Sequence, residues 1–203
     1  DPNLFPYSRV DDPVIPDSRK RALEAWGQLE FTFPWEPGNN WMSIDIYQLR
    51  FNIRSPFPVQ IAVREALDYI HQPGIMVIEA PMGTGKTEAA LAAAEILAEL
   101  TERRGIFFAL PTQATSDGIF PRVKDWLSRL ETEEAQSIRL VHGKAQFNPN
   151  FQYLANGKNI GEDVESGVYV HDWFTGRKRA LLDDFVVGTI DQLLMAALKQ
   201  KHV

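Results

Sequence analysis

The segment from Ala80 to Thr87, APMGTGKT, has the residue types and spacing of a loop that binds the phosphates of a nucleoside triphosphate. Ahead of it, residues 74–79 form a short apolar run that predicts a buried parallel strand. Behind it, residues 86–100 are rich in Ala, Leu and Glu and predict a helix. A strand, a glycine turn and a helix N-terminus together direct unpaired backbone N–H groups and the positive end of the helix dipole at one point, which suits an anion.

Lys86 and Thr87 are the candidate catalytic residues of this loop. We expect the Lys86 ammonium to reach the β- and γ-phosphates and the Thr87 hydroxyl to be the metal ligand for Mg²⁺, so ATP and Mg²⁺ are the expected cofactors. The candidate nucleotide-binding residues are Gln60, Ala80, Pro81, Met82, Gly83, Thr84, Gly85, Lys86, Thr87 and Glu88.

Gln60 precedes the phosphate loop by one predicted helix and one predicted strand. Its amide has the donor and acceptor that can bind adenine at N6 and N7, with Phe51 or Phe57 against the ring. A surface glutamine at the start of a helix explains the same residue equally well.

Polar residues follow two further apolar runs, 106–110 and 184–188, which predict strands. These residues would lie at the carboxyl edge of the sheet, where ligands bind in open α/β folds. Hydroxyls and exposed helix N–H groups suit nucleic-acid phosphates, although simple helix caps at Thr112 and at Thr189 or Asp191 remain an alternative. The candidate nucleic-acid-binding residues are Pro111, Thr112, Gln113, Thr115, Gly188, Thr189 and Gln192.

Two other polar clusters carry weaker signals. The basic run Arg177-Lys178-Arg179 could contact a phosphate backbone, or it could be a solvated helix face. The dipeptide His171-Asp172 contains metal-ligand types, but a metal site needs several ligands held together, so we do not expect one there.

The elements that must position these residues alternate along the chain. Apolar strand segments separated by helix-length segments imply an α/β fold with a parallel, doubly wound sheet. A proline- and aromatic-rich lead-in, residues 1–56, is expected to pack on a core domain formed by residues 57–203. Helices are predicted at 18–29, 59–69, 85–100, 113–130 and 189–201, strands at 75–80, 106–110, 138–142 and 184–188, a helical turn at 177–182, and a loop or insertion at 143–170.

Composition narrows the class of protein. The chain has 203 residues, of which 44% are hydrophobic and 24% charged, as in an ordinary globular domain. It has neither an apolar run of membrane-span length nor the layout of a signal peptide, so we expect a cytoplasmic protein with no membrane partner. The absence of cysteine excludes disulfides and thiolate metal sites, and a net charge of −6 means that nucleic acid would need a local basic patch.

Ala80 stands where the usual pattern has its first glycine, and this form is typical of superfamily 2 helicases. From about residue 50 onward the order of motifs resembles the CRISPR-associated helicase-nuclease of type I systems. The stretch ending in GTIDQLLMAALKQKH is the most specific, because other superfamily 2 proteins do not usually have Gly-Thr-Ile-Asp-Gln there. The matching stretches are Gln60, APMGTGKTEAAL, ALPTQATSDGIF, LVHGKA and GRKRALLDDFVVGTIDQLLMAALKQKH.

This resemblance implies a RecA-like P-loop ATPase core that moves 3′ to 5′ along single-stranded DNA in antiviral defence. It also implies an RNA-guided CRISPR surveillance complex as a partner and an attached nuclease that degrades target DNA. We expect the sheet to be incomplete at the C-terminus, because Val203 precedes the strand that carries the Asp-Glu-x-His motif in this family. That motif supplies a Mg²⁺ carboxylate, and the remainder of the helicase supplies an arginine finger, so the chain alone is expected to be nearly inactive.

Three alternatives remain open. The chain could be part of another superfamily 2 nucleic-acid-dependent ATPase, such as an RNA helicase or a restriction-type translocase. It could be a nucleotide-binding module such as a small-molecule kinase, although kinases usually place a lid and a substrate-phosphate site after the phosphate loop. It could also be a product without enzymatic activity that acts only as a binding partner.

Overall fold

The computed structural model divides into two units, residues 1–33 and residues 34–203. In the first unit the structure describes one helix, α1 (Ser18–Gln28), which was expected. Its N-cap is Asp17, whose Oδ1 accepts from the backbone N–H groups of Arg19 and Lys20 at 3.1 Å each. Across both units the described residues are 17–29, 34–38, 45–130, 132, 135–157, 167–174 and 179–198.

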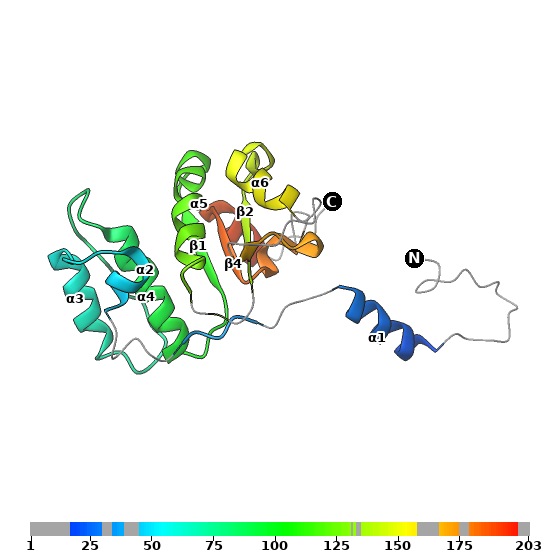
Figure 1. Ribbon diagram of the computed structural model, residues 1–203, viewed down its shortest axis with the longest axis horizontal. Helices are drawn as coiled ribbons and strands as arrows, with labels where there is room; N and C mark the ends of the chain where they lie inside the picture. Colours follow the sequence, from blue (N-terminus) through cyan, green and yellow to red (C-terminus); the bar gives the residue numbers. More distant parts are fainter. Residues whose placement is uncertain are drawn as a thin grey trace, which may run out of the picture. The chain divides into compact units, whose positions relative to one another are not determined.

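The second unit is built on a four-stranded parallel sheet with the order β1-β4-β2-β3. The strands lie side by side in Figure 1, and their common direction confirms the predicted α/β class. Three of the four were expected from the sequence, and β3 was not. The strands are β1 (Ile106–Leu110), β2 (Gln136–Val141), β3 (Val168–Tyr169) and β4 (Phe185–Thr189).

Both faces of β4 are buried, which explains why its sequence is continuously apolar rather than alternating. Phe185 and Val187 belong to the larger apolar cluster, which includes side chains of α5 (Gln113–Leu127). Val186, between them, packs with Phe107 and Ala180 in a separate cluster on the other side of the sheet. Successive side chains of β4 thus alternate between the two clusters, as expected for a strand with a core on each face.

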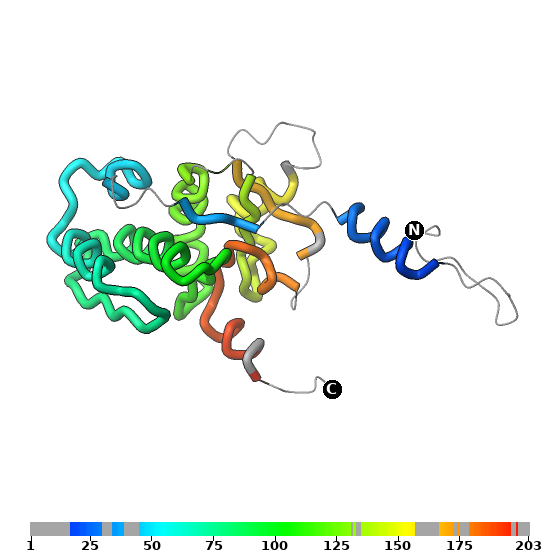
Figure 2. The backbone as a smooth tube through the Cα atoms, turned by 90° about the horizontal axis from the view of Figure 1, so that it is seen from below, coloured from blue at the N-terminus to red at the C-terminus, as the bar shows by residue number. Residues whose placement is uncertain are grey.

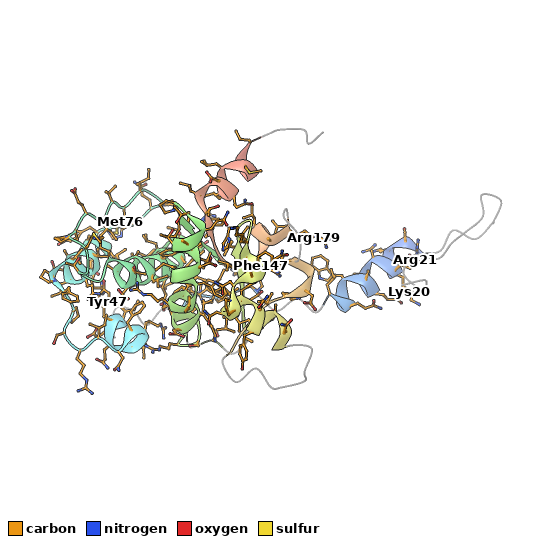
Figure 3. The ribbon with its side chains drawn as sticks, turned by 90° about the horizontal axis from the view of Figure 1, so that it is seen from above. Lys20, Arg21, Tyr47, Met76, Phe147 and Arg179 are labelled. Atoms are coloured by element: carbon orange, nitrogen blue, oxygen red, sulfur yellow. The ribbon has the colours of Figure 1, made fainter. Side chains whose placement is uncertain are left out.

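Three helices surround a second apolar cluster: α2 (Ile46–Phe51), α3 (Pro58–Leu67) and α4 (Lys86–Leu100). The contribution of α4 to this cluster consists mainly of alanines, Ala89, Ala92 and Ala93, whose small side chains allow neighbouring helices to approach closely. Tyr47 on α2 is fully packed in it, and Met76 packs against it. Both are labelled in Figure 3, at the end of the unit where these three helices lie.

The predicted strand before the phosphate loop is wrong. Residues 74–79 run without secondary structure, at the end of the unit formed by α3 and α4 in Figures 1 and 2. Met76 and Ile78 pack against the cluster of α2, α3 and α4, whereas Ile75 and Val77 are 96% and 83% exposed. A strand exists only when a neighbour pairs with its backbone, and no described strand lies beside this segment.

The predicted loop at 143–170 is also wrong in part. Besides β3 it contains a 3₁₀ turn, η2 (Ala145–Phe147), and helix α6 (Pro149–Gly157). The Asn148 Oδ1 atom accepts from the Phe151 N–H at 3.0 Å, and Pro149 occupies the first helical position. Asn-Pro is therefore a helix start here, since asparagine caps and proline is tolerated in the first turn.

The remaining described elements are short. The 3₁₀ turns η4 (Asp172–Phe174) and η5 (Arg179–Leu182) precede β4, and helix α7 (Ile190–Ala197) follows it. None of the helices in the described part of the chain is long and apolar enough to cross a lipid bilayer.

Trp35 joins the segment before α2 to the sheet. Its side chain is 2% exposed, and its ring centroid lies 5.0 Å from that of Phe185 and 6.5 Å from that of Trp126. Other aromatic residues of that stretch, Phe31, Phe33 and Trp41, lie outside the described residues.

A buried carboxylate, Glu95 on α4, connects α2 and α5. Its oxygens accept from Arg50 Nε at 3.0 and 3.2 Å and from Trp126 Nε1 at 3.1 Å, and Arg50 Nη2 lies 2.9 Å from Oε1. Arg50 also donates to the Arg129 carbonyl at 2.6 Å. Because each charged group is paired and hydrogen-bonded, the cost of burying it is offset.

Replacing Glu95 by Gln should lower the free energy of unfolding by about 3 kcal/mol, because the Arg50 guanidinium would stay buried without a counter-charge. Asp68→Asn is the matched control. It breaks the exposed Arg64–Asp68 pair on α3, with N···O 2.6 Å, and should cost no more than about 0.5 kcal/mol. Denaturant unfolding measures both, and equal losses would contradict the role of Glu95.

A second buried charged pair lies at β2 and the start of β4. Arg139 Nε is 3.6 Å from Asp183 Oδ2, and the Asp183 side chain has no exposed surface. Burial raises the pKa of Asp183 to about 6 despite the attraction of Arg139, and burial also raises the pKa of Asp184 to about 6. Desolvation therefore outweighs the ion pair at this position.

The sign of the resulting pH dependence follows from proton binding. Between pH 4 and 6 the folded state binds protons at Asp183 that the unfolded state has released, so this group's contribution to stability falls as the pH rises through that window. In Asp183→Asn that contribution disappears. The unfolding free energy of the variant minus that of the parent, measured from pH 4 to 7, should therefore increase as the pH rises. A difference independent of pH would contradict the raised pKa.

Candidate functional site

The predicted phosphate loop forms a turn that only glycine adopts without strain at two positions. Gly83 and Gly85 have φ angles of 78° and 76°, and Gly85 is the N-cap of α4. The Thr84 hydroxyl closes the turn by donating to the Pro81 carbonyl at 2.8 Å. The loop therefore delivers the chain directly into the first turn of α4.

Lys86 lies across this loop. Its ammonium donates to the carbonyls of Ala80 at 2.5 Å and Pro81 at 2.7 Å. No side chain caps the N-terminus of α4, so the first-turn N–H groups have no side-chain acceptor. Cation, loop and helix N-terminus together form a positively polarised site.

A cavity of about 500 Å³ opens beside the loop. This volume is within the range of small-molecule sites. Seven of the ten predicted nucleotide-binding residues line it, and Ala80, Pro81 and Thr84 do not. Arg122 of α5 also lines it, and sequence reasoning missed this residue because 34 positions separate it from Glu88 along the chain. The lining residues are Ile53, Phe57, Gln60, Met82, Gly83, Gly85, Lys86, Thr87, Glu88 and Arg122.

Gln60 lines the cavity but is itself fully buried. Its amide oxygen accepts from the Phe57 N–H at 2.9 Å, and its amide nitrogen donates to the Gly85 carbonyl at 3.2 Å. Tyr47 donates to the Gln60 carbonyl at 2.8 Å, and burial raises the pKa of Tyr47 to about 12. The amide nitrogen thus holds the phosphate loop to α3 while the amide oxygen caps the start of α3, and the adenine contact stays a prediction. Phe57, which is 47% exposed, is the aromatic ring that lines the cavity.

Thr112, at the end of β1, is the N-cap of α5, as the sequence indicated. Its hydroxyl accepts from the Thr115 N–H at 3.2 Å, and the Thr115 hydroxyl donates back to the Thr112 carbonyl at 2.8 Å. The cap thus uses both hydroxyls, although Pro111, Thr112, Gln113 and Thr115 are all exposed. Capping does not exclude contact with a ligand.

The sheet brings the two nucleic-acid-binding candidates together. Leu110 pairs in register with Thr189, so the residues after β1 and after β4 leave the sheet at the same level. We call residues 111–115 with residues 188–192 the nucleic-acid edge, after the contact that the sequence predicts for them. Gly188 is required for its packing, since a Cβ there would lie 2.7 Å from the Val141 carbonyl. Thr189 is buried, and Gln192 is half-buried.

A further group lies at the end of β2. His142, whose side chain is buried, has Nε2 3.0 Å from Asp117 Oδ1 on α5, and Asn148 donates to the same oxygen at 2.7 Å. The His142 Nδ1 atom accepts from the Lys144 N–H at 3.3 Å, so Nε2 carries the proton. With both ring nitrogens engaged, His142 holds the chain after β2 to α5. Sequence reasoning found His142 by resemblance but not these partners.

The described residues of the two weaker polar clusters do not line this cavity. Arg177 and Lys178 lie outside the described residues, while Arg179 is exposed on η5 (Figure 3). His171 is buried between Tyr169 and Phe174, and its carbonyl accepts from the Arg139 guanidinium. Within the described ranges there is no group of three or more His, Cys, Asp or Glu side chains that could hold a metal ion.

The chain matches curated relatives and solved structures. It is 42% identical over 205 residues to the CRISPR-associated nuclease/helicase Cas3 of Streptococcus thermophilus, covering 99% of this chain and 22% of that protein. It is 39% identical over 205 residues to the endonuclease/helicase Cas3 of Thermus thermophilus, covering 100% and 22%. The crystal structure of T. fusca Cas3 with AMPPNP matches with a TM-score of 0.72 and 31% identity over 91% of this chain and 20% of that one. No family model matches the chain.

The fold and the phosphate loop define a RecA-like α/β domain. The chain is a homologue of the CRISPR-associated Cas3 nuclease/helicases, and the resemblance seen in its sequence is confirmed. It spans about a fifth of the length of these two relatives.

The loop glycines allow a matched comparison. An added Cβ at Gly85 would lie 2.4 Å from Gln60 Nε2, whereas one at Gly83 meets nothing within 4 Å. Both have positive φ, so each Ala variant carries a backbone penalty of about 1–2 kcal/mol. Gly85→Ala must also displace the buried Gln60, and should cost at least about 1 kcal/mol more than Gly83→Ala in unfolding free energy. Equal costs would show that Gln60 does not fix the loop.

Proposed function

We propose that the chain is the ATP-binding part of an ATP-dependent single-stranded DNA translocase or helicase that acts in CRISPR antiviral defence. The observation that carries this proposal is the cavity at the N-terminus of α4, with Lys86 on the phosphate loop and Thr87 beside it. The whole protein would degrade target DNA with an attached nuclease, as the name nuclease/helicase of its relatives suggests.

The residues of the cavity fit ATP and Mg²⁺. Gly83, Gly85 and the uncapped first turn of α4 offer backbone N–H groups to phosphates, and Lys86 offers a mobile charge that leaves the carbonyls of the loop for the anion. Thr87 would be a ligand of Mg²⁺, which neutralises charge on the phosphates when bound. The similar T. fusca Cas3 structures with ADP, ATP and AMPPNP support nucleotide binding.

The nucleic-acid edge would hold the single strand. Its exposed hydroxyls and the N-terminus of α5 suit phosphate oxygens, and it lies at the carboxyl edge of a parallel sheet, where ligands of open α/β folds bind. Contacts of this kind position a strand without reading its sequence. This is what a protein that moves along DNA requires.

We further propose that residues 57–203 form the first RecA-like domain of the motor, with residues 1–56 as its lead-in, and that the protein is cytoplasmic. The remainder of the helicase would supply the carboxylate ligand for Mg²⁺ and an arginine finger, and an RNA-guided surveillance complex would recruit the protein. The chain alone would therefore hydrolyse ATP barely, since an arginine finger contributes a factor of about 10³–10⁵ to the rate.

ATP hydrolysis by the whole protein tests the proposal, measured with and without single-stranded DNA. Turnover should require DNA, and Lys86→Ala should reduce it at least about 100-fold because a charge on the transferred phosphate is lost. Lys124→Ala on α5, whose ammonium lies 6.0 Å from the Tyr153 ring centroid and outside the cavity, is the control and should retain turnover. Turnover that is independent of DNA, or stimulated only by RNA, would favour another superfamily 2 ATPase.

A further inference from the structure

Arg122 is a cationic side chain of the nucleotide cavity that comes from a different helix than the phosphate loop. It projects from α5 and donates from Nη2 to Oε1 of Glu88, in the first turn of α4. The two side chains are 48% and 19% exposed, so the guanidinium can exchange partners without first leaving a closed core. Glu88 follows Thr87 directly, so this ion pair lies next to the proposed Mg²⁺ ligand.

The charge balance of the cavity changes when a triphosphate enters. Before binding, Lys86 is occupied by two carbonyls and Arg122 by Glu88. A triphosphate competes with Glu88 for Arg122, because it is a stronger and more highly charged acceptor than one carboxylate. The guanidinium has five N–H donors in a planar fork that matches phosphate oxygens.

Helix α5 links this ion pair to the nucleic-acid edge. The helix begins at Gln113, capped by Thr112, and Arg122 lies ten residues beyond the cap, which is about 15 Å along the axis. Between these points the helix contains Gly118 and Pro121. Pro121 has no N–H to donate, so the Asp117 carbonyl loses its helical partner, and kinks occur at such positions.

We propose that Arg122 exchanges Glu88 for the triphosphate when nucleotide binds, and that α5 thereby couples nucleotide occupancy to the nucleic-acid edge. This inference rests on the proposed function. By linkage, the coupling is reciprocal: a triphosphate changes the affinity for the single strand by the same factor as the strand changes the affinity for the triphosphate.

The test uses the whole protein, a non-hydrolysable ATP analogue (AMPPNP) and single-stranded DNA. The Kd of each ligand is measured with and without the other in the parent, Arg122→Gln, Arg122→Lys and the control Arg64→Gln on α3. We expect Arg122→Gln to weaken AMPPNP binding about tenfold and to bring the coupling factor close to 1. Arg122→Lys, which keeps the charge but loses the fork, should be intermediate, and Arg64→Gln should behave as the parent.

The double variant Glu88→Gln/Arg122→Gln separates phosphate contact from simple neutralisation of Glu88. If Arg122 only screened Glu88, removing both charges would restore the parent's AMPPNP affinity and coupling, and the inference would be overturned. We expect no restoration. Unchanged coupling in Arg122→Gln would overturn it as well.

These outcomes are distinct from failure of the proposed function. A parent protein that does not bind AMPPNP, or whose AMPPNP binding is insensitive to Lys86→Ala, would refute the nucleotide site itself. A parent in which the two ligands are coupled, with Arg122→Gln equal to Arg64→Gln, refutes only the role of Arg122.

Discussion

The position of the phosphate loop depends on the buried carboxylate of Glu95. In a typical open α/β domain the strand before the loop fixes it to the sheet, but residues 74–79 are unpaired here. The loop is attached instead to α3 through Gln60 and directly to α4, and Glu95 joins α4 to Trp126 of α5, which packs on the sheet. Arg50 connects α2 to the same carboxylate through a hydrogen bond and an ion pair. A buried hydrogen-bond network of this kind fixes one relative position of the three helices, because every donor must meet its acceptor.

The sequence predicted the features that depend on local patterns. The apolar runs of β1, β2 and β4 and the alanine-rich α4 appear where period and propensity place them. The glycines of the phosphate loop have the positive φ angles that the motif implies. Thr112 caps α5 because its hydroxyl can reach the N–H three residues on, a contact that needs no tertiary information.

Features that depend on distant partners could not be predicted in this way. Residues 74–79 have the composition of a strand, yet pairing is decided by a neighbour that composition does not reveal. Glu95 and Arg122 look like surface residues of amphipathic helices, and only the packing of α4 against α5 shows their partners. For Gln60, the sequence suggested an available amide, whereas the turn at Gly85 brings a carbonyl within its reach.

The same packing explains how one helix could serve the two proposed sites. One end of α5 lies at the nucleic-acid edge, and its middle carries Arg122 into the nucleotide cavity. Near its C-terminus, Trp126 is fixed by Glu95 and by the aromatic contacts with Trp35 and Phe185. A helix anchored at one end and interrupted by Pro121 concentrates any adjustment in the part before the anchor. The buried charge that positions the phosphate loop therefore also anchors the C-terminal part of α5, on which the proposed coupling would depend.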